Sequence, residues 1–291
     1  MKLVRYGPPG REKPGLIDAA GKIRELSAHI DDLSGAALAP RSLHKIATLD
    51  PDSLPVVPGN PRIGPCVAGT GKFIGIGLNY SDHAAEAGLQ VPREPVVFMK
   101  ATSAISGPND PIEIPPDSAK TDWEAELGVV IGEKAKYVSE DLALQHIAGY
   151  CVVNDVSERE YQMERDGQWV KGKSADTFGP VGPWLVTRDE VPDPQNLKIW
   201  LEVNGHRYQD GNTRTMVFGV RYLVAYLSWF MTLQPGDIIT TGTPPGVGLG
   251  LDPPGYLTKG DTVTLGIDGL GEQRQEVVQG YGPEAGCGLH S

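Results

Sequence analysis

Short apolar runs, separated by turn-forming residues, fill most of this sequence from Lys72 onward. The chain contains 37 glycines and 25 prolines, which interrupt regular structure and favour turns. Apolar runs of this length are typical of β-strands. They lie at Phe73–Gly77, Val96–Lys100, Ile112–Ile114, Glu124–Ile131, Ala148–Asn154, Trp184–Val186, Lys198–Val203, Asp237–Thr241 and Thr262–Ile267. Helical patterns are fewer, at Ser81–Ala87, Glu140–Leu144, Ser157–Glu164 and Val220–Met231. The sequence therefore predicts a mainly β protein with some α-helix, of the α+β class.

The first 68 residues differ from the rest of the chain. Short strand-like pieces lie at Lys2–Tyr6, Gly15–Asp18 and Lys22–Glu25, and a weakly helical piece lies near Ser42–Thr48. Five prolines between Pro51 and Pro65 then break regular structure. We therefore expect a small N-terminal α/β domain at 1–68, a catalytic domain at 69–280 and a loose, glycine-rich tail at 281–291.

Composition excludes several classes of partner. Hydrophobic residues make up 40% and charged residues 22%, as in globular proteins. A net charge of -11 and a pI near 5.0 argue against binding to nucleic acid or to anionic membranes. We find neither an apolar stretch near the roughly 18 residues of a membrane span nor an apolar core of a secretory signal, so a cytoplasmic protein is expected. Cys66, Cys151 and Cys287 lack the spacing of a thiolate metal site.

Two acidic residues interrupt an apolar run, in the stretch Asp-Trp-Glu-Ala-Glu at 122–126. If this run is a strand, its two-residue period places Glu124 and Glu126 on one face, where they repel each other unless a cation lies between them. Asp155, which ends a second apolar run, adds a third carboxylate. Oxygen ligands without His or Cys favour Mg²⁺, Mn²⁺ or Ca²⁺ over Zn²⁺. The alternative is a solvated face of an antiparallel strand.

A short predicted helix after the strand at Phe73–Gly77 carries His83 and Glu86. These residues are three apart and share one helical face, where the carboxylate can orient the imidazole and raise its basicity. The pair has the outline of a general-base dyad. By spacing alone, a surface pair on a solvated helix is the commoner arrangement.

Two segments rich in Gly and Pro carry further polar groups. The segment 171–180 is predicted to be a loop and contains Lys171 and Lys173, which stabilise negative charge if they are buried and only solvate the loop if they are exposed. The turn at 240–248 offers hydroxyl and backbone N–H groups suited to a carboxylate, although such turns often only reverse the chain. It lacks the GK[ST] ending of a phosphate-binding loop.

Taken together, these motifs resemble the fumarylacetoacetate hydrolase superfamily. The order GLNYxDH, ExE, ND, KSxDTFGPxGPW and TGTPxGVG spans Lys72–Gln273. The opening MKLVRYG and the early PGL look like the bacterial branch named for ureidoglycolate lyase or for hydrolases of 2,4-diketo-3-deoxy-L-rhamnonate and L-fuconate. The resemblance implies a mixed β-sandwich roll, a homodimer and a magnesium cofactor, with Mn²⁺ as a substitute.

The resemblance also implies roles for individual residues. Glu124, Glu126 and Asp155 match the metal carboxylates of the family. His83 and Glu86 match its water-activating dyad, which lies on a lid that orders over the substrate.

Four further residues match positions that contact the substrate. Lys173 corresponds to the lysine beside the reacting carbonyl, whereas Lys171 receives no role. Arg159 and Gln162 fall where substrate-contacting side chains follow the metal aspartate, and Thr243 matches the residue that holds the substrate carboxylate.

The implied activity is hydrolysis of the C3–C4 bond of a 2,4-diketo acid, of the 2,4-diketo-3-deoxy-L-rhamnonate or L-fuconate type, to pyruvate and a carboxylic acid such as lactate. Water deprotonated by His83 would attack C4, and the charge left on the pyruvate enolate would lie near the cation and Lys173. Ureidoglycolate lyase, acylpyruvase or oxaloacetate decarboxylase, and 2-hydroxyhepta-2,4-diene-1,7-dioate isomerase remain alternatives, because the same site can stabilise the charge that each reaction develops.

Overall fold

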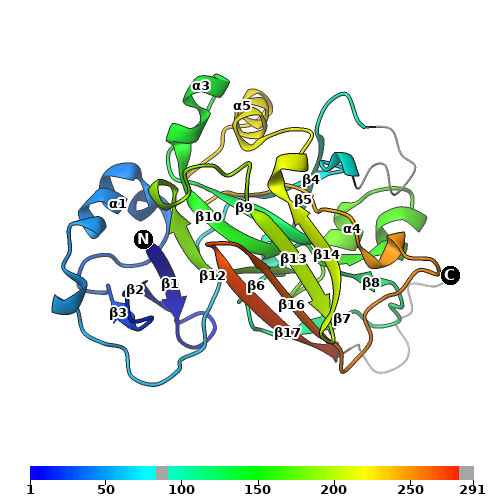
Figure 1. Ribbon diagram of the computed structural model, residues 1–291, viewed down its shortest axis with the longest axis horizontal. Coiled ribbons are helices and arrows are strands. Elements are labelled where there is room, and N and C mark those ends of the chain that lie inside the picture. Colours follow the sequence, from blue (N-terminus) through cyan, green and yellow to red (C-terminus); the bar gives the residue numbers. More distant parts are fainter. Residues whose placement is uncertain (83–90, 282–291) are drawn as a thin grey trace.

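A computed structural model describes residues 1–82 and 91–281, and its largest feature is a ten-stranded sheet (Figure 1). The strands of this sheet are β1 (Lys2–Tyr6), β2 (Lys13–Ile17), β3 (Ile23–Glu25), β4 (Phe73–Gly77), β5 (Val96–Lys100), β6 (Ile105–Ser106), β9 (Ala125–Ile131), β10 (Ile147–Asn154), β12 (Gly179–Thr187) and β15 (Ile238–Thr240). Their order is β3-β2-β1-β12-β10-β9-β15-β4-β5, with β6 paired to β12. Most neighbours are antiparallel, but β15 runs parallel to β4 and β6 runs parallel to β12, so the sheet is mixed.

A second sheet has five strands in the order β14-β13-β16-β17-β7. They are β7 (Ile112–Ile114), β13 (Lys198–Val203), β14 (His206–Asn212), β16 (Thr262–Ile267) and β17 (Gly271–Gln279). A two-stranded sheet pairs β8 (Thr121–Asp122) with β11 (Ser157–Glu158). The mainly β, α+β class predicted from the sequence is confirmed.

Helices are short and lie outside the sheets. The α-helices in the described residues are α1 (Pro40–Ala47), α3 (Glu140–Ala143), α4 (Val170–Lys173) and α5 (Val220–Phe230), and a π-helical turn spans Glu160–Glu164. Short 3-10 turns occupy Gly35–Leu38, Pro51–Ser53, Thr102–Ala104, Leu144–His146, Arg188–Glu190, Thr213–Thr215 and Gly248–Gly250. Within the described residues, no helix is long and apolar enough to cross a membrane.

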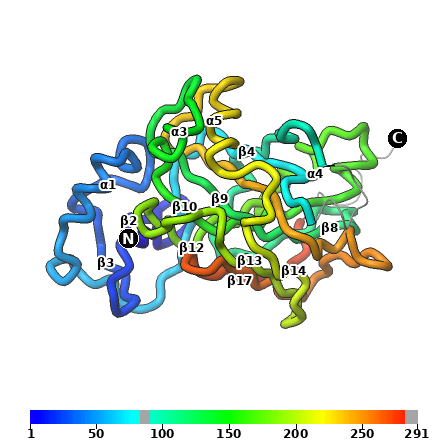
Figure 2. Tube along the Cα trace, turned by 45° about the horizontal axis from the view of Figure 1, so that its top comes forward, coloured from blue at the N-terminus to red at the C-terminus, as the bar shows by residue number. Residues whose placement is uncertain are grey.

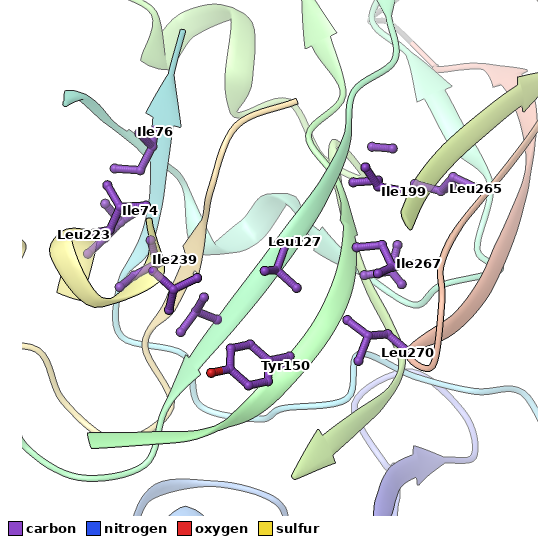
Figure 3. Packing of buried hydrophobic residues seen from close by; sticks show 14 of the residues in the cluster. Ile74, Ile76, Leu127, Tyr150, Ile199, Leu223, Ile239, Leu265, Ile267 and Leu270 are labelled. Atoms are coloured by element: carbon purple, nitrogen blue, oxygen red, sulfur yellow. The ribbon is translucent and has the colours of Figure 1, made fainter. Parts of the chain in front are cut away.

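The main core lies between the two sheets and against α5. Alternate residues of β9 point to opposite faces of the large sheet, so Leu127 enters this core while Val130 faces the other way. Figure 3 shows Leu127 near the centre of the cluster, with Ile199 and neighbouring residues of the second sheet on one side and Leu223 of α5 on the other. This packing fixes β9 and β10, the two strands that carry the acidic motifs, inside the molecule.

A second core joins the first strands to the opposite face of the large sheet. β1 pairs with β12 in antiparallel fashion, so β1, β2 and β3 extend the ten-stranded sheet. Leu3 and Leu33 pack in one cluster with Val130 and Val153. Figure 2 places these N-terminal strands at one side of the molecule, away from α4 and β8. The boundary at 68/69 stays a prediction.

Several local predictions were wrong. The predicted helix at 157–164 is instead β11 followed by the π-helical turn, and the segment predicted as a loop at 171–180 begins inside α4 and ends in β12. Strands β14 and β17 were not expected. The inward face of β17 carries Gln273 and Gln275, which are buried and hydrogen-bonded, so the apolar alternation that identifies a strand is missing.

Candidate metal centre and active-site cavity

Strand register brings the three predicted metal carboxylates together. In the antiparallel pair of β9 and β10, Glu126 lies opposite Val153, and the Asp155 backbone N–H donates to the Glu124 carbonyl at 2.9 Å just beyond. Glu124, Glu126 and Asp155 are all buried, and each offers an oxygen within 4.8 Å of the others. At about 4 Å two unit charges repel by roughly 4 kcal/mol at the effective dielectric of a protein site. A solvated strand face is therefore excluded, and the cluster needs positive charge.

Burial and neighbouring charge act strongly on Glu126. Burial raises the Glu126 pKa well above its usual value, and the charges of Asp155 and Glu124 raise it further. One carboxylate oxygen accepts hydrogen bonds from Thr240 Oγ1 at 2.5 Å and from the Gly242 N–H at 2.7 Å. These bonds come from β15 and the following turn, and they hold Glu126 in place, whereas no Lys or Arg among residues 1–82 and 91–281 forms an ion pair with it.

Two buried lysines supply some of the missing positive charge. Lys173 Nζ, at the end of α4, lies 2.8 Å from Glu124 Oε2 and 2.8 Å from Asp155 Oδ2. Lys100 Nζ, at the end of β5, donates to Asp155 Oδ1 at 2.5 Å. Burial alone would lower the pKa of Lys173, but the charges of Asp155 and Glu124 outweigh it and raise the pKa, so Lys173 is held as an ammonium.

Arg159 completes the charged cluster. Its Nη2 lies 2.7 Å from Glu124 Oε1 without hydrogen-bond geometry, and its Nε donates to Asp122 Oδ2 at 2.8 Å. Burial alone would raise the Glu124 pKa, but the charges of Lys173 and Arg159 lower it, so Glu124 is ionised.

Asp122 links Arg159 to the turn that follows Val247. Its Oδ1 accepts the N–H groups of Trp123 and Gly248 at 2.8 and 2.7 Å, and its Oδ2 accepts the Leu249 N–H at 2.9 Å. All of its hydrogen bonds are thus internal, and the carboxylate is fully buried. Asp122 holds the guanidinium and the turn in a fixed relation.

A cavity of about 490 Å³ opens onto this cluster, a size typical of small-molecule sites. The charged residues lining it are Glu124, Glu126, Arg159 and Lys173. The larger apolar residues lining it are Ile76, Leu78, Phe98, Met163, Trp169, Val247 and Leu249. The cavity thus combines a charged cluster with an extensive apolar surface.

Two of the predicted substrate contacts also line this cavity. The Gln162 amide oxygen accepts from Arg159 Nη1 at 3.0 Å, whereas its amide nitrogen donates to no other described residue. Thr243 Oγ1 donates to the Ala125 carbonyl at 2.8 Å and accepts from Gln209 Nε2 at 2.7 Å. The hydroxyl proton of Thr243 is thus already used, while Gln162 keeps a free donor. The roles of both residues in substrate binding stay predictions.

The predicted dyad, His83 and Glu86, lies outside the described residues. The segment before it is described, and the Asn79 side chain joins that segment to the turn at Thr241 by donating to its carbonyl at 2.8 Å. Leu78, which lines the cavity, precedes the undescribed stretch by a few residues.

Lys100 and Asp122 are site residues that were not assigned from the sequence. A signal for each was present. Lys100 lies two residues after Phe98 on a strand, so it shares the inward face of an apolar side chain. Asp122 continues the two-residue period of Glu124 and Glu126.

Comparison with known proteins agrees with this geometry. Residues 72–278 match the family described as fumarylacetoacetate (FAA) hydrolase, C-terminal. The chain belongs to the fumarylacetoacetate hydrolase family. A protein of Burkholderia cenocepacia, named as a candidate hydrolase, is 69% identical over 276 residues, which are 94% of this chain and 98% of that protein.

Two solved structures extend the likeness to the whole fold of the family. The fumarylacetoacetate hydrolase of psychrophilic Exiguobacterium antarcticum is 35% identical, with a TM-score of 0.85 over 96% of this chain and 99% of that one. The maleylpyruvate hydrolase of Sphingobium sp. SYK-6, solved with manganese(II) and pyruvate, is 30% identical, with a TM-score of 0.80 over 97% of this chain and 100% of that one.

Proposed function

We propose that this member of the fumarylacetoacetate hydrolase family is a metal-dependent hydrolase that cleaves the C3–C4 bond of a 2,4-diketo acid to pyruvate and a carboxylic acid. The observation that carries the proposal is the convergence of three buried carboxylates within 4.8 Å at a cavity that Lys173 also lines. The manganese and pyruvate bound to the Sphingobium relative support both the cofactor and the product.

The carboxylates fit a hard divalent cation. All three donors are oxygens, and burial together with the charges of Asp155 and Glu124 raises the pKa of Glu126 although Lys173 acts in the opposite direction. We propose Mg²⁺, with Mn²⁺ as a substitute, held by Glu124, Glu126 and Asp155. When bound, such a cation polarises a carbonyl group and offsets negative charge that develops on it.

The residues of the chain bind and orient the diketo acid. The free amide donor of Gln162 and the guanidinium of Arg159 are placed to bind the substrate carboxylate. The Lys173 ammonium is placed to stabilise negative charge on the C2 oxygen, because it is buried and remains protonated. These contacts would fix the C1–C3 half of the substrate and leave C4 accessible to water.

The bond changes then balance without an oxidant or reductant. His83 removes a proton from water as the water oxygen bonds to C4, the C3–C4 electron pair passes to C3 as an enolate, and a proton returned to C3 completes pyruvate. The C4 half leaves as a carboxylic acid. We further propose that the enzyme acts as a homodimer in the cytoplasm.

Pyruvate release is the test of this function. The enzyme is incubated with acetylpyruvate, 2,4-diketo-3-deoxy-L-rhamnonate and oxaloacetate, after chelation and again after addition of Mg²⁺ or Mn²⁺. We expect release from a 2,4-diketo acid only when metal is present. Ureidoglycolate cleavage or isomerisation of 2-hydroxyhepta-2,4-diene-1,7-dioate, with no pyruvate from any diketo acid, would replace hydrolysis with the lyase or isomerase reaction.

A further inference from the structure

Two glycines of β4 create space for two aromatic rings at the cavity. Gly75 and Gly77 share one face of the strand. A Cβ atom on Gly75 would lie 2.2 Å from Phe98 Cζ, and one on Gly77 would lie 2.3 Å from Trp169 Cζ3. Any larger residue at either position would displace a ring. The two glycines of β4 therefore leave the space that the rings of Phe98 and Trp169 occupy. We name these two rings the aromatic wall.

The aromatic wall begins beside the charged cluster and continues outward. Lys173 Nζ lies 5.1 Å from the centre of the Phe98 ring. The Phe98 ring packs against Trp169 at 5.5 Å between centroids, tilted by 56°. Phe98 is buried and Trp169 is half-buried. A substrate fixed at Lys173 would therefore extend its distal group along these two rings.

The apolar surface around the aromatic wall offers little to a polar distal group. Met163 and Leu249 line the same cavity. Among its described lining the only cationic side chains are Arg159 and Lys173, which lie at the charged cluster and are the groups proposed above to bind the C1 carboxylate and the C2 oxygen. A polyol chain or a second carboxylate would lose its water without gaining a partner there. An apolar planar group would lose nothing and could stack on the rings.

We propose that the acyl group of the substrate is apolar and planar, so that the preferred substrates are 2,4-diketo acids with an aromatic or conjugated group on C4 rather than sugar acids or dicarboxylic acids. This inference rests on the proposed function, since it extends the substrate from the charged cluster. It makes Phe98 and Trp169 specificity-determining residues and departs from the sugar-acid substrate predicted from the sequence.

The kinetic test compares benzoylpyruvate, acetylpyruvate and 2,4-diketo-3-deoxy-L-rhamnonate by kcat/KM for pyruvate release with Mn²⁺. We expect benzoylpyruvate to exceed each of the others at least about tenfold, as hydrophobic pockets commonly discriminate by that factor or more. Trp169→Ala should reduce this preference at least about tenfold, and Trp169→Phe should retain most of it. Preference for the sugar acid, or an equal loss for benzoylpyruvate and acetylpyruvate in Trp169→Ala, would overturn the inference.

A binding test separates this inference from the reaction itself. Oxamate and N-phenyloxamate, which differ by one aromatic ring, are titrated into the Mn²⁺-loaded enzyme by calorimetry. N-phenyloxamate should bind at least about tenfold tighter, and Trp169→Ala should abolish that difference. Trp229→Ala is the matched control, because Trp229 is 64% exposed and does not line the cavity. If no diketo acid is cleaved but the ring still tightens binding, the proposed reaction fails and the aromatic subsite stands; equal binding of both ligands overturns the subsite.

Discussion

Asp122 Oδ2 and Arg159 Nε lie 2.8 Å apart in a fully buried hydrogen bond, and the same carboxylate accepts the Gly248 and Leu249 N–H groups. One side chain thus positions both a guanidinium at the charged cluster and a turn that lines the cavity. Because Arg159 also contacts Glu124, a change at Asp122 reaches the candidate metal site without removing a metal carboxylate.

Replacing Asp122 should therefore impair both folding and substrate binding. We expect Asp122→Ala to lower the free energy of unfolding by about 3 to 5 kcal/mol, as for removal of one partner of a buried ion pair, measured by urea denaturation. Asp122→Asn, which keeps the shape, should raise the KM for acetylpyruvate roughly tenfold or more. Glu202→Gln serves as control, because its pair with Arg207 is partly exposed and should contribute less than about 1 kcal/mol. Wild-type KM in Asp122→Asn would show that the pair only stabilises the fold.

The metal assignment predicts that Glu126→Gln loses cation binding. The substitution keeps the size of the side chain but removes one of three charges, so the Kd for Mn²⁺ should rise more than about 100-fold. This is a larger loss of affinity than the loss of a residue that only hydrogen-bonds to a metal ligand causes. Titration of Mn²⁺ by electron paramagnetic resonance measures this directly. Glu158→Gln is a matched control, because Glu158 is equally buried and bonds to Thr121 and the Lys120 N–H instead of joining the cluster. Similar Mn²⁺ binding by the two variants would refute the site.

Lys173 should be needed for the reaction but not for the metal. Lys173→Met removes an ammonium that lies 2.8 Å from both Glu124 and Asp155, so Mn²⁺ affinity should stay the same or increase. Pyruvate release should fall roughly a hundredfold to a thousandfold, the usual cost of losing one group that stabilises an oxyanion. Lys171→Met, two residues away and exposed, should change neither quantity. A tenfold loss of Mn²⁺ affinity in Lys173→Met would mean that the lysine organises the carboxylates.

The dyad predicted from the sequence leads to a separate expectation for His83. His83→Ala should lower pyruvate release by roughly two to four powers of ten while the Kd for Mn²⁺ stays within about twofold, because general-base catalysis has that size and His83 is not among the metal carboxylates. His44→Ala, on the exposed side of α1, is the control. Loss of Mn²⁺ binding in His83→Ala would make His83 a ligand and remove the water-activating role.

How far the sequence predicted this site depends on which interactions are local. The two-residue period of Glu124 and Glu126 is a property of one strand and could be read from the sequence. Asp155 was added as a third carboxylate because it ends a second apolar run, and the family resemblance then matched it to a metal ligand. Its closeness to Glu124 and Glu126 depends on the register of β9 and β10, which the sequence does not give. The strand pattern around Lys100 indicated that its side chain faces inward, but its contact with Asp155 spans 55 residues and joins strands that are not neighbours in the sheet, so the pattern did not identify its partner.

The strands, too, were predicted only where the pattern within a single strand indicated them. The strand β13 was predicted with its observed bounds, since its buried apolar residues alternate with more exposed ones. Strand β17 was not predicted, because two of its inward residues are glutamines that form hydrogen bonds and so interrupt the apolar pattern of a strand. The packing of Phe98 and Trp169 over Gly75 and Gly77 was also not predicted, because a glycine in a strand does not indicate which aromatic ring from elsewhere in the sequence packs against it.

The glycines beneath the aromatic wall have a consequence for how such an enzyme can diverge. The groups that would bind the cation come from the start of β9 and the end of β10, whereas the Trp169 ring is admitted by Gly77 of β4. A single mutation to a bulkier residue at Gly77 would displace the Trp169 ring and reshape the distal pocket without replacing any charged side chain. Related enzymes could thus change their substrate specificity through small substitutions in β4 and keep the same catalytic residues.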